Sequence, residues 1–158
     1  MRFLKVFLSA VFLFAFFNAQ AQPITGAFGL KLGEYIPDWT KGKQIGTIEG
    51  FKDNFFNHIE IHVTPYSKRI WKIFARKENC RGLGALISTL DEKYLQHKKQ
   101  WQEGDTGTIY LDGENKILVR CHLYDTAITL TYQNEKLAEV IWDEKEAFEK
   151  ENIDKSKL

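Results

Sequence analysis

The sequence predicts an α+β protein, in which an antiparallel sheet of five or six strands carries two helices packed on one face and one disulfide. Several segments between residues 45 and 132 alternate apolar and polar residues, which is the period of half-buried strands. Two other segments, beginning at Asn79 and at Asn134, repeat apolar residues at intervals of three and four, which is the helical period. Two cysteines, Cys80 and Cys121, lie in different elements and can join them.

The chain begins like a secretory signal peptide. Two basic residues precede an apolar run over residues 6–17, and a small-x-small pattern ends at Ala21. The run is shorter than the about 20 residues that a membrane-spanning helix needs. We therefore expect a signal peptide over residues 1–21, a single α+β domain over 22–150 and a charged tail over 151–158. The mature protein is expected to be periplasmic or secreted, with no membrane insertion.

Composition argues against two classes of partner. Cleavage removes two of the 22 basic residues, so that 20 basic side chains stand against 21 acidic ones and the formal net charge of the mature chain is −1. A nucleic-acid-binding protein usually has a clear basic excess, and a helix that lies on a membrane surface is basic and amphipathic. We therefore predict neither a nucleic-acid partner nor attachment to a membrane surface.

The two cysteines are expected to form a disulfide, because export leads to an oxidising compartment where disulfides form and persist. A bond between Cys80 and Cys121 would close a loop of 41 residues. Chain entropy gives such a cross-link about 4 kcal/mol. A redox-active pair is usually Cys-x-x-Cys, and a zinc site of this type would need a second cysteine pair. Neither pattern occurs.

Turn residues divide the chain into elements. Pro65-Tyr66-Ser67 joins two strands as a hairpin, and the glycine-containing loop 112–115 joins two more. Asn79 is the expected N-cap of a helix that runs to about His97, and Asn134 the expected N-cap of the last helix. The expected strands are 57–64, 68–76, 108–111, 116–124 and 127–132; the alternation over 28–32 suits a further strand, and residues 45–51 are a candidate for a short one.

The sheet is expected to have one apolar and one polar face, because side chains alternate along a strand. In the segment HIEIHV, Ile59, Ile61 and Val63 would face the helices. The polar side of this strand and of the strand 116–124 then supplies a candidate binding face. Trp101, beside the polar loop that follows it, is a further candidate anchor, since exposed tryptophans are common in binding sites. The candidate binding residues are His58, Glu60, His62, Trp101, Arg120, His122 and Tyr124.

A metal site on this face would need a third ligand. Neighbours on one face of a strand are about 6.6 Å apart, so His58 and His62, about 13 Å apart, do not easily bind one ion. Glu60 with either histidine would need His122 from a neighbouring strand, and zinc usually takes three or four protein ligands. The alternative is the polar outer face of an ordinary antiparallel sheet. We predict no metal ligands.

No recognised catalytic pattern is present. The sequence contains neither the Gly-x-Ser-x-Gly elbow of hydrolases nor the His-Glu-x-x-His helix of metalloproteases. The segment Arg81-Gly82-Leu83-Gly84 lacks the spacing of either nucleotide-binding motif. Both cysteines are assigned to the disulfide. The chain is therefore predicted not to be an enzyme and to need no cofactor.

The order of elements resembles that of small exported bacterial (periplasmic) α+β proteins of uncharacterised function. The resemblance rests on Phe28-Gly29-Leu30-Lys31-Leu32-Gly33 after the signal, a cysteine before a helix that ends near Glu92-Lys93-Tyr94, and a late hairpin with the second cysteine. It implies a periplasmic, non-catalytic role and no catalytic residues. We expect a binding surface for another periplasmic protein, as in inhibitors and immunity proteins. The alternatives are a small-ligand or metal binder that uses the polar sheet face, and an unrecognised hydrolase.

Overall fold

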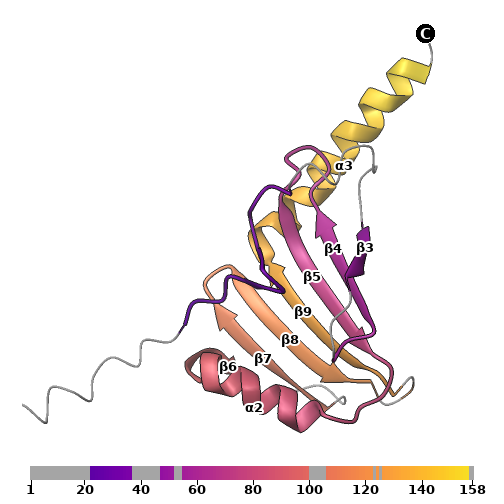
Figure 1. The fold of residues 1–158 in the computed structure, drawn as a ribbon. Coiled ribbons are helices and arrows are strands. Elements are labelled where there is room, and N and C mark those ends of the chain that lie inside the picture. The colour runs from indigo at the N-terminus through magenta and orange to yellow at the C-terminus, as the bar shows by residue number, and fades with distance from the viewer. Residues whose placement is uncertain are drawn as a thin grey trace, which may run out of the picture.

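The fold is that of a computed structural model, and it is built on an antiparallel sheet (Figure 1). The structure describes residues 22–36, 47–51, 55–99, 106–122, 124 and 126–156. Within these residues the sheet has seven strands in the order β3-β4-β5-β9-β8-β7-β6. The strands are β3 (Thr47–Phe51), β4 (His58–Val63), β5 (Ile70–Lys77), β6 (Lys98–Lys99), β7 (Thr106–Asp112), β8 (Asn115–Cys121) and β9 (Ile128–Asn134).

The predicted fold class is confirmed. The sheet is antiparallel throughout, and six of its strands have five residues or more, while β6 has only two. The α-helices of the described residues are α2 (Leu83–Tyr94) and α3 (Glu135–Ser156), and a short 3-10 turn, η3 (Leu95–His97), follows α2. The predicted disulfide joins Cys80 to Cys121, with 5.6 Å between their Cα atoms. No helix of the described residues is both long enough and apolar enough to span a bilayer.

The core lies on one face of the sheet, as the alternation predicts. In β4, Ile59 and Ile61 are almost completely buried, whereas His58, Glu60 and His62, which alternate with them, are half-buried. The same alternation buries Ile117 and Val119 in β8. Helix α2 packs on this core face near β8. Tyr110 of β7 is fully buried on the same face.

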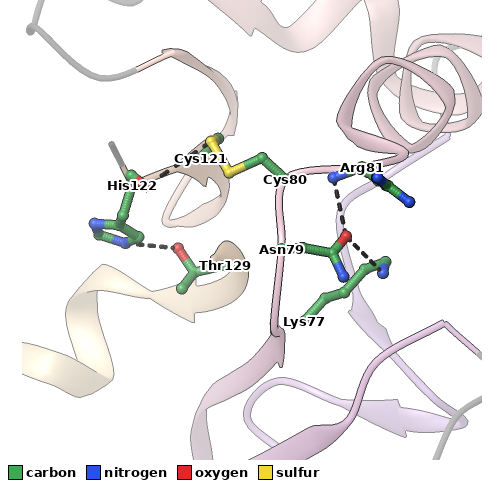
Figure 2. Close-up of a disulfide and its surroundings, with 7 residues drawn as sticks. All are labelled: Lys77, Asn79, Cys80, Arg81, Cys121, His122 and Thr129. Atoms are coloured by element: carbon green, nitrogen blue, oxygen red, sulfur yellow. Dashed lines mark hydrogen bonds between the residues drawn. A yellow bond between two sulfur atoms is a disulfide. The ribbon is translucent and has the colours of Figure 1, made fainter. Parts of the chain in front are cut away.

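The start of α2 differs from the prediction. Asn79 is not its N-cap: the cap is Gly82, with φ 92° and no side-chain hydrogen bond. The Asn79 side-chain oxygen instead accepts hydrogen bonds from the backbone N–H of Arg81 and from the ammonium group of Lys77 (Figure 2). These bonds hold the turn that carries Cys80 to the end of β8, so the disulfide lies immediately before the helix.

Helix α3 begins as predicted but makes different contacts from α2. Asn134 caps it, because the Asn134 side-chain oxygen accepts a 2.9 Å hydrogen bond from the Leu137 backbone N–H. The sequence placed both helices on one face, yet Glu135 pairs with Lys116, whose side chain lies on the face opposite the core. Figure 1 shows α3 behind the end of β5, on the other side of the sheet from α2. The turn between β4 and β5 also contacts α3, because the Ser67 hydroxyl donates a 2.9 Å hydrogen bond to Glu144 of that helix.

The tail and one strand boundary also differ from the prediction. Residues 151–156 of the predicted charged tail continue α3, where intrahelical pairs such as Lys150 with Glu146 add support. Strand β8 ends at Cys121 rather than at residue 124, because the His122 backbone N–H bonds to the Ala127 carbonyl and turns the chain into β9.

The predicted strand 28–32 is a small hairpin. It consists of β1 (Gly26–Ala27) and β2 (Leu30–Lys31), which form a separate two-stranded sheet. Phe28 and Gly29 both have positive φ and form the two-residue turn between them, a conformation that matches the twist of paired strands. The turn breaks the alternation that residues 28–32 suggested.

Segment 22–36, which contains this hairpin, crosses the core face on the same side as α2 (Figure 1). Its ends are fixed to the sheet. The Ile24 backbone N–H donates to Asp112 at the end of β7, and the Ile70 backbone N–H of β5 donates to the Glu34 carbonyl. Ile24 and Ile36 are buried beneath the segment. The core face is therefore covered by α2 on one half of the sheet and by segment 22–36 on the other.

Candidate functional site

The sheet face opposite the core carries most of the predicted binding residues, and we call it the polar face. Strands β4, β5, β9 and β8 are consecutive neighbours, so their outward residues form three rows across the sheet. The first row holds His58, Arg76, Thr129 and Arg120; the second Glu60, Phe74, Thr131 and Leu118; the third His62, Lys72, Gln133 and Lys116.

The rows differ in chemistry. Each outer row contains two basic residues, Arg76 and Arg120 in the first and Lys72 and Lys116 in the third. The middle row contains Phe74, Thr131 and Leu118, and its carboxylate, Glu60, lies at one end. The polar face therefore has a weakly polar centre with basic residues on both sides.

On β4, Glu60 is bound by both of its histidine neighbours. The Nε2 atom of His58 lies 2.6 Å from one carboxylate oxygen, and the Nε2 atom of His62 lies 3.1 Å from the other. Burial acts to raise the pKa of Glu60, but the hydrogen bond from His58 and the attraction of His62 outweigh it and lower that pKa. Both oxygens of Glu60 thus have a neighbour within the protein.

A β-bulge widens this end of the polar face. The register between β4 and β5 shifts after His62, so that His62 pairs with Lys72 and Val63 with Ile70. Trp71 is the extra residue, and its ring contacts the His62 ring at a centroid distance of 5.6 Å. Burial lowers the pKa of His62, and the charge of Lys72 lowers it further against the attraction of Glu60. Burial likewise lowers the pKa of Lys72.

Lys72 of β5 lies beside two aromatic rings. The Lys72 ammonium lies 5.2 Å from the Trp71 ring centroid and 5.8 Å from that of Phe74. Such cation–π contacts stabilise an amine at a face that is partly open to water. Lys72, Trp71 and Phe74 therefore form one cluster of basic and aromatic side chains on β5.

At the other end, on β8, His122 extends the first row. Its Nε2 atom lies 3.2 Å from the Thr129 hydroxyl oxygen, and Figure 2 shows this pair beside the disulfide. The Nε atom of Arg120 is buried and has no hydrogen-bond partner within the described residues. Tyr124 is fully exposed in the connection between β8 and β9, away from the strand rows. Trp101 lies outside the described residues.

The structure separates the two groups of histidines. His122 follows β8, and β5 and β9 lie between β8 and β4. Three strand spacings of about 4.8 Å put about 14 Å between these strands, so His122 cannot join Glu60 and a β4 histidine on one ion. Within the described parts of the chain, no group of three or more His, Cys, Asp or Glu side chains is arranged to hold a metal. The three-ligand metal site of Glu60, a β4 histidine and His122 is therefore not assembled.

The central residues of this face were not recognised from the sequence. Lys72, Phe74 and Arg76 alternate with the buried Ile73 and Ala75, so the strand period alone places them on the polar face. What the sequence does not contain is the strand order that puts β5 and β9 between the two predicted groups. Lys116 could have been found by the same alternation.

The charges of the polar face are unequal. Lys116 is paired with Glu135 at the border with α3, and Glu60 is engaged by histidines. In these four strands the four basic residues of the rows exceed the one carboxylate, whereas the whole chain has a formal net charge of only +1. Excess positive charge around the half-buried Phe74 and Leu118 suits a partner that presents acidic groups around an apolar side chain.

Comparison with known protein families, curated proteins and solved structures finds no significant match to this chain.

Proposed function

We propose that the protein is an exported, non-catalytic binding protein that docks an acidic surface of another periplasmic protein on its polar face. The observation that supports this most directly is the arrangement of the three rows, in which Arg76, Arg120, Lys72 and Lys116 flank a centre containing Phe74. Export is inferred from the sequence of residues 1–21, and the disulfide is compatible with an oxidising compartment.

The rigidity of the face also supports a binding role. The rows lie on regular strands rather than on loops, and their spacing is set by continuous strand pairing from β4 to β8. A preorganised surface loses little conformational entropy when it binds. Arginine and aromatic side chains, of which this face has both, commonly contribute most to interface affinity. A folded partner can therefore dock without reorganisation of this surface.

The test compares two variants with equal charge changes. Arg76→Glu with Arg120→Glu reverses two charges of the polar face, and Lys145→Glu with Lys150→Glu reverses two on the exposed side of α3. Immobilised mature protein, residues 22–158, is incubated with the periplasmic fraction of host cells, and retained proteins are quantified by mass spectrometry. Circular dichroism confirms that each variant is folded.

We expect one partner that the wild type and the α3 variant retain and that the polar-face variant binds at least about tenfold more weakly, a loss of about 1.4 kcal/mol or more. Retention should also weaken as salt rises, because exposed charges are screened. Equal retention by both variants would show that the partner binds elsewhere. If the double glutamate variant does not fold, Arg76→Gln with Arg120→Gln removes the charge without introducing repulsion.

A further inference from the structure

We propose that the opposite, core side of the sheet contains a second binding site, a cavity between α2 and segment 22–36 that accepts a fatty acid. This inference is independent of the proposed function, because the cavity and the polar face lie on opposite sides of the sheet. The cavity has a volume of about 480 Å³. Sites for small ligands typically measure roughly 300–1,000 Å³.

The cavity is located where the two covers of the core face meet. Its floor is formed by Leu130 and Tyr132 of β9. Leu86 and Leu90 of α2 line one wall, and Phe28 of the small hairpin belongs to the other. Figure 1 shows α2 and segment 22–36 on the same side of the sheet. Because each covers only part of the core face, a space remains over β9.

The aromatic wall is held in place by packing. The rings of Phe28 and Phe56 meet edge to face with 5.9 Å between centroids, and those of Phe55 and Phe56 with 4.9 Å. A side chain at Gly82 would approach the Phe55 ring to 3.0 Å, so Phe55 lies directly against the start of α2. The shape of the wall therefore depends on ring contacts between segment 22–36, residues 55–56 and α2.

The lining is mainly apolar, and its few polar groups can bind the anionic head group of a ligand. Lys93, in the last turn of α2, lines the cavity and is exposed, and within the described residues it has neither an ion pair nor a hydrogen bond. The remaining polar side chains of the lining are Thr89 and Tyr132. A sugar or a nucleotide would leave many of its polar groups unpaired in such a cavity, which is costly. A single carboxylate on a long apolar body fits one cation and a carbon lining.

A second observation, independent of Lys93, also indicates a polar ligand atom. The Tyr132 side chain lines the cavity and is only 5% exposed, and its hydroxyl has no hydrogen-bond partner within the described residues. The hydroxyl is not among the fully enclosed polar atoms without a partner, so it is accessible from the cavity and can donate a hydrogen bond to a ligand there. Burial and the neighbouring Tyr94 raise the pKa of Tyr132, so this hydroxyl remains a donor at neutral pH. A carboxylate can accept from both Tyr132 and Lys93.

The test uses delipidated mature protein and the fluorescent fatty acid cis-parinaric acid, followed by displacement with palmitate and with hexadecanol. Palmitate and hexadecanol have the same chain length but differ in the charge of the head group. Lys93→Met removes the ammonium, and Lys99→Met, at the exposed position of β6, is the matched control. Leu86→Trp fills the cavity, and Tyr132→Phe removes only the hydroxyl.

We expect saturable binding of one fatty acid per chain, with palmitate displacing the probe at lower concentration than hexadecanol. Lys93→Met should weaken palmitate binding about tenfold or more and leave hexadecanol binding unchanged. The control Lys99→Met should bind both ligands as the wild type does. Tyr132→Phe should weaken palmitate binding to a smaller extent, and Leu86→Trp should abolish binding of both ligands while the circular dichroism spectrum stays the same. Absence of saturable binding to the folded wild type, or equal binding of both ligands regardless of Lys93, would overturn the proposal.

Discussion

The disulfide is the feature whose energetic effect the structure predicts most directly. It connects the residues just before α2 to the end of β8, and the two cysteines are separated by 41 positions in the sequence. In the chain-entropy description, closing a loop of this length restricts the unfolded chain and stabilises the folded state by about 4 kcal/mol. Cys80→Ser with Cys121→Ser should therefore lower the free energy of unfolding by about that amount.

Urea unfolding of the oxidised wild type and of the double serine variant, followed by tryptophan fluorescence, measures this difference. With an m-value of about 2 kcal/mol/M, the midpoint should fall by about 2 M. The m-value itself should rise in the variant, because an unfolded chain without the cross-link exposes more surface.

Wild-type protein reduced with dithiothreitol is the control for packing. Cys121 is only 7% exposed, so replacing its sulfur can also remove contacts within the core. Reduced wild type keeps both sulfurs and isolates the effect of the cross-link. If reduction lowers the free energy of unfolding by less than about 1 kcal/mol and leaves the m-value unchanged, the cross-link does not stabilise the fold by restricting the unfolded chain. That result would refute the chain-entropy reasoning.

Three further predictions concern single side chains. Tyr110→Phe should cost about 2 kcal/mol in urea unfolding, because the buried hydroxyl donates a 2.7 Å hydrogen bond to the Asp91 carboxylate; an unchanged midpoint would contradict that bond. The pKa of His62 is lowered in the folded protein, so the unfolded chain binds the proton at a higher pH. Stability should therefore decline as the pH falls through the ordinary value of 6.5. The lowered pKa of Glu60 adds a second decline in stability below pH 4.5. In His62→Gln the first decline should be absent from unfolding curves recorded between pH 7 and 5, and its persistence would assign it to another group. Asn134→Ala should cost about 1 kcal/mol through loss of the α3 cap, measured by urea unfolding, and increased amide exchange confined to the first turn of α3 would locate the effect there.

The elements and the core face could be predicted from the sequence because they depend on local periodicity. The alternation in His58–Val63 and the caps and turns around it are contained in a few consecutive residues, and the structure has the strand and the buried isoleucines in the expected places. Local rules failed where a tertiary constraint overrode them. Asn79 has the chemistry of an N-cap, but the turn that brings Cys80 to Cys121 moves the start of α2 to Leu83.

The candidate binding residues show the same division. The alternation of side chains along each strand was enough to assign His58, Glu60, His62 and Arg120 to one face of a sheet. Alternation along a strand gives no information on the distance between strands. The sequence therefore could neither separate the two histidine groups nor reveal that β5 supplies residues between them. Trp101 remains a sequence prediction, since it lies outside the described residues.

By itself the sequence determined the fold class, the disulfide partners and the two-sided character of the strands, because periodicity and a single cysteine pair leave few alternatives. Only the tertiary structure decided the strand order, the three rows of the polar face and the position of α3. It also decided the cavity, whose lining comes from segment 22–36, residues 55–56, α2 and β9. The physical reason is that these features arise from contacts between residues far apart in the chain, for which local sequence patterns contain no distance information.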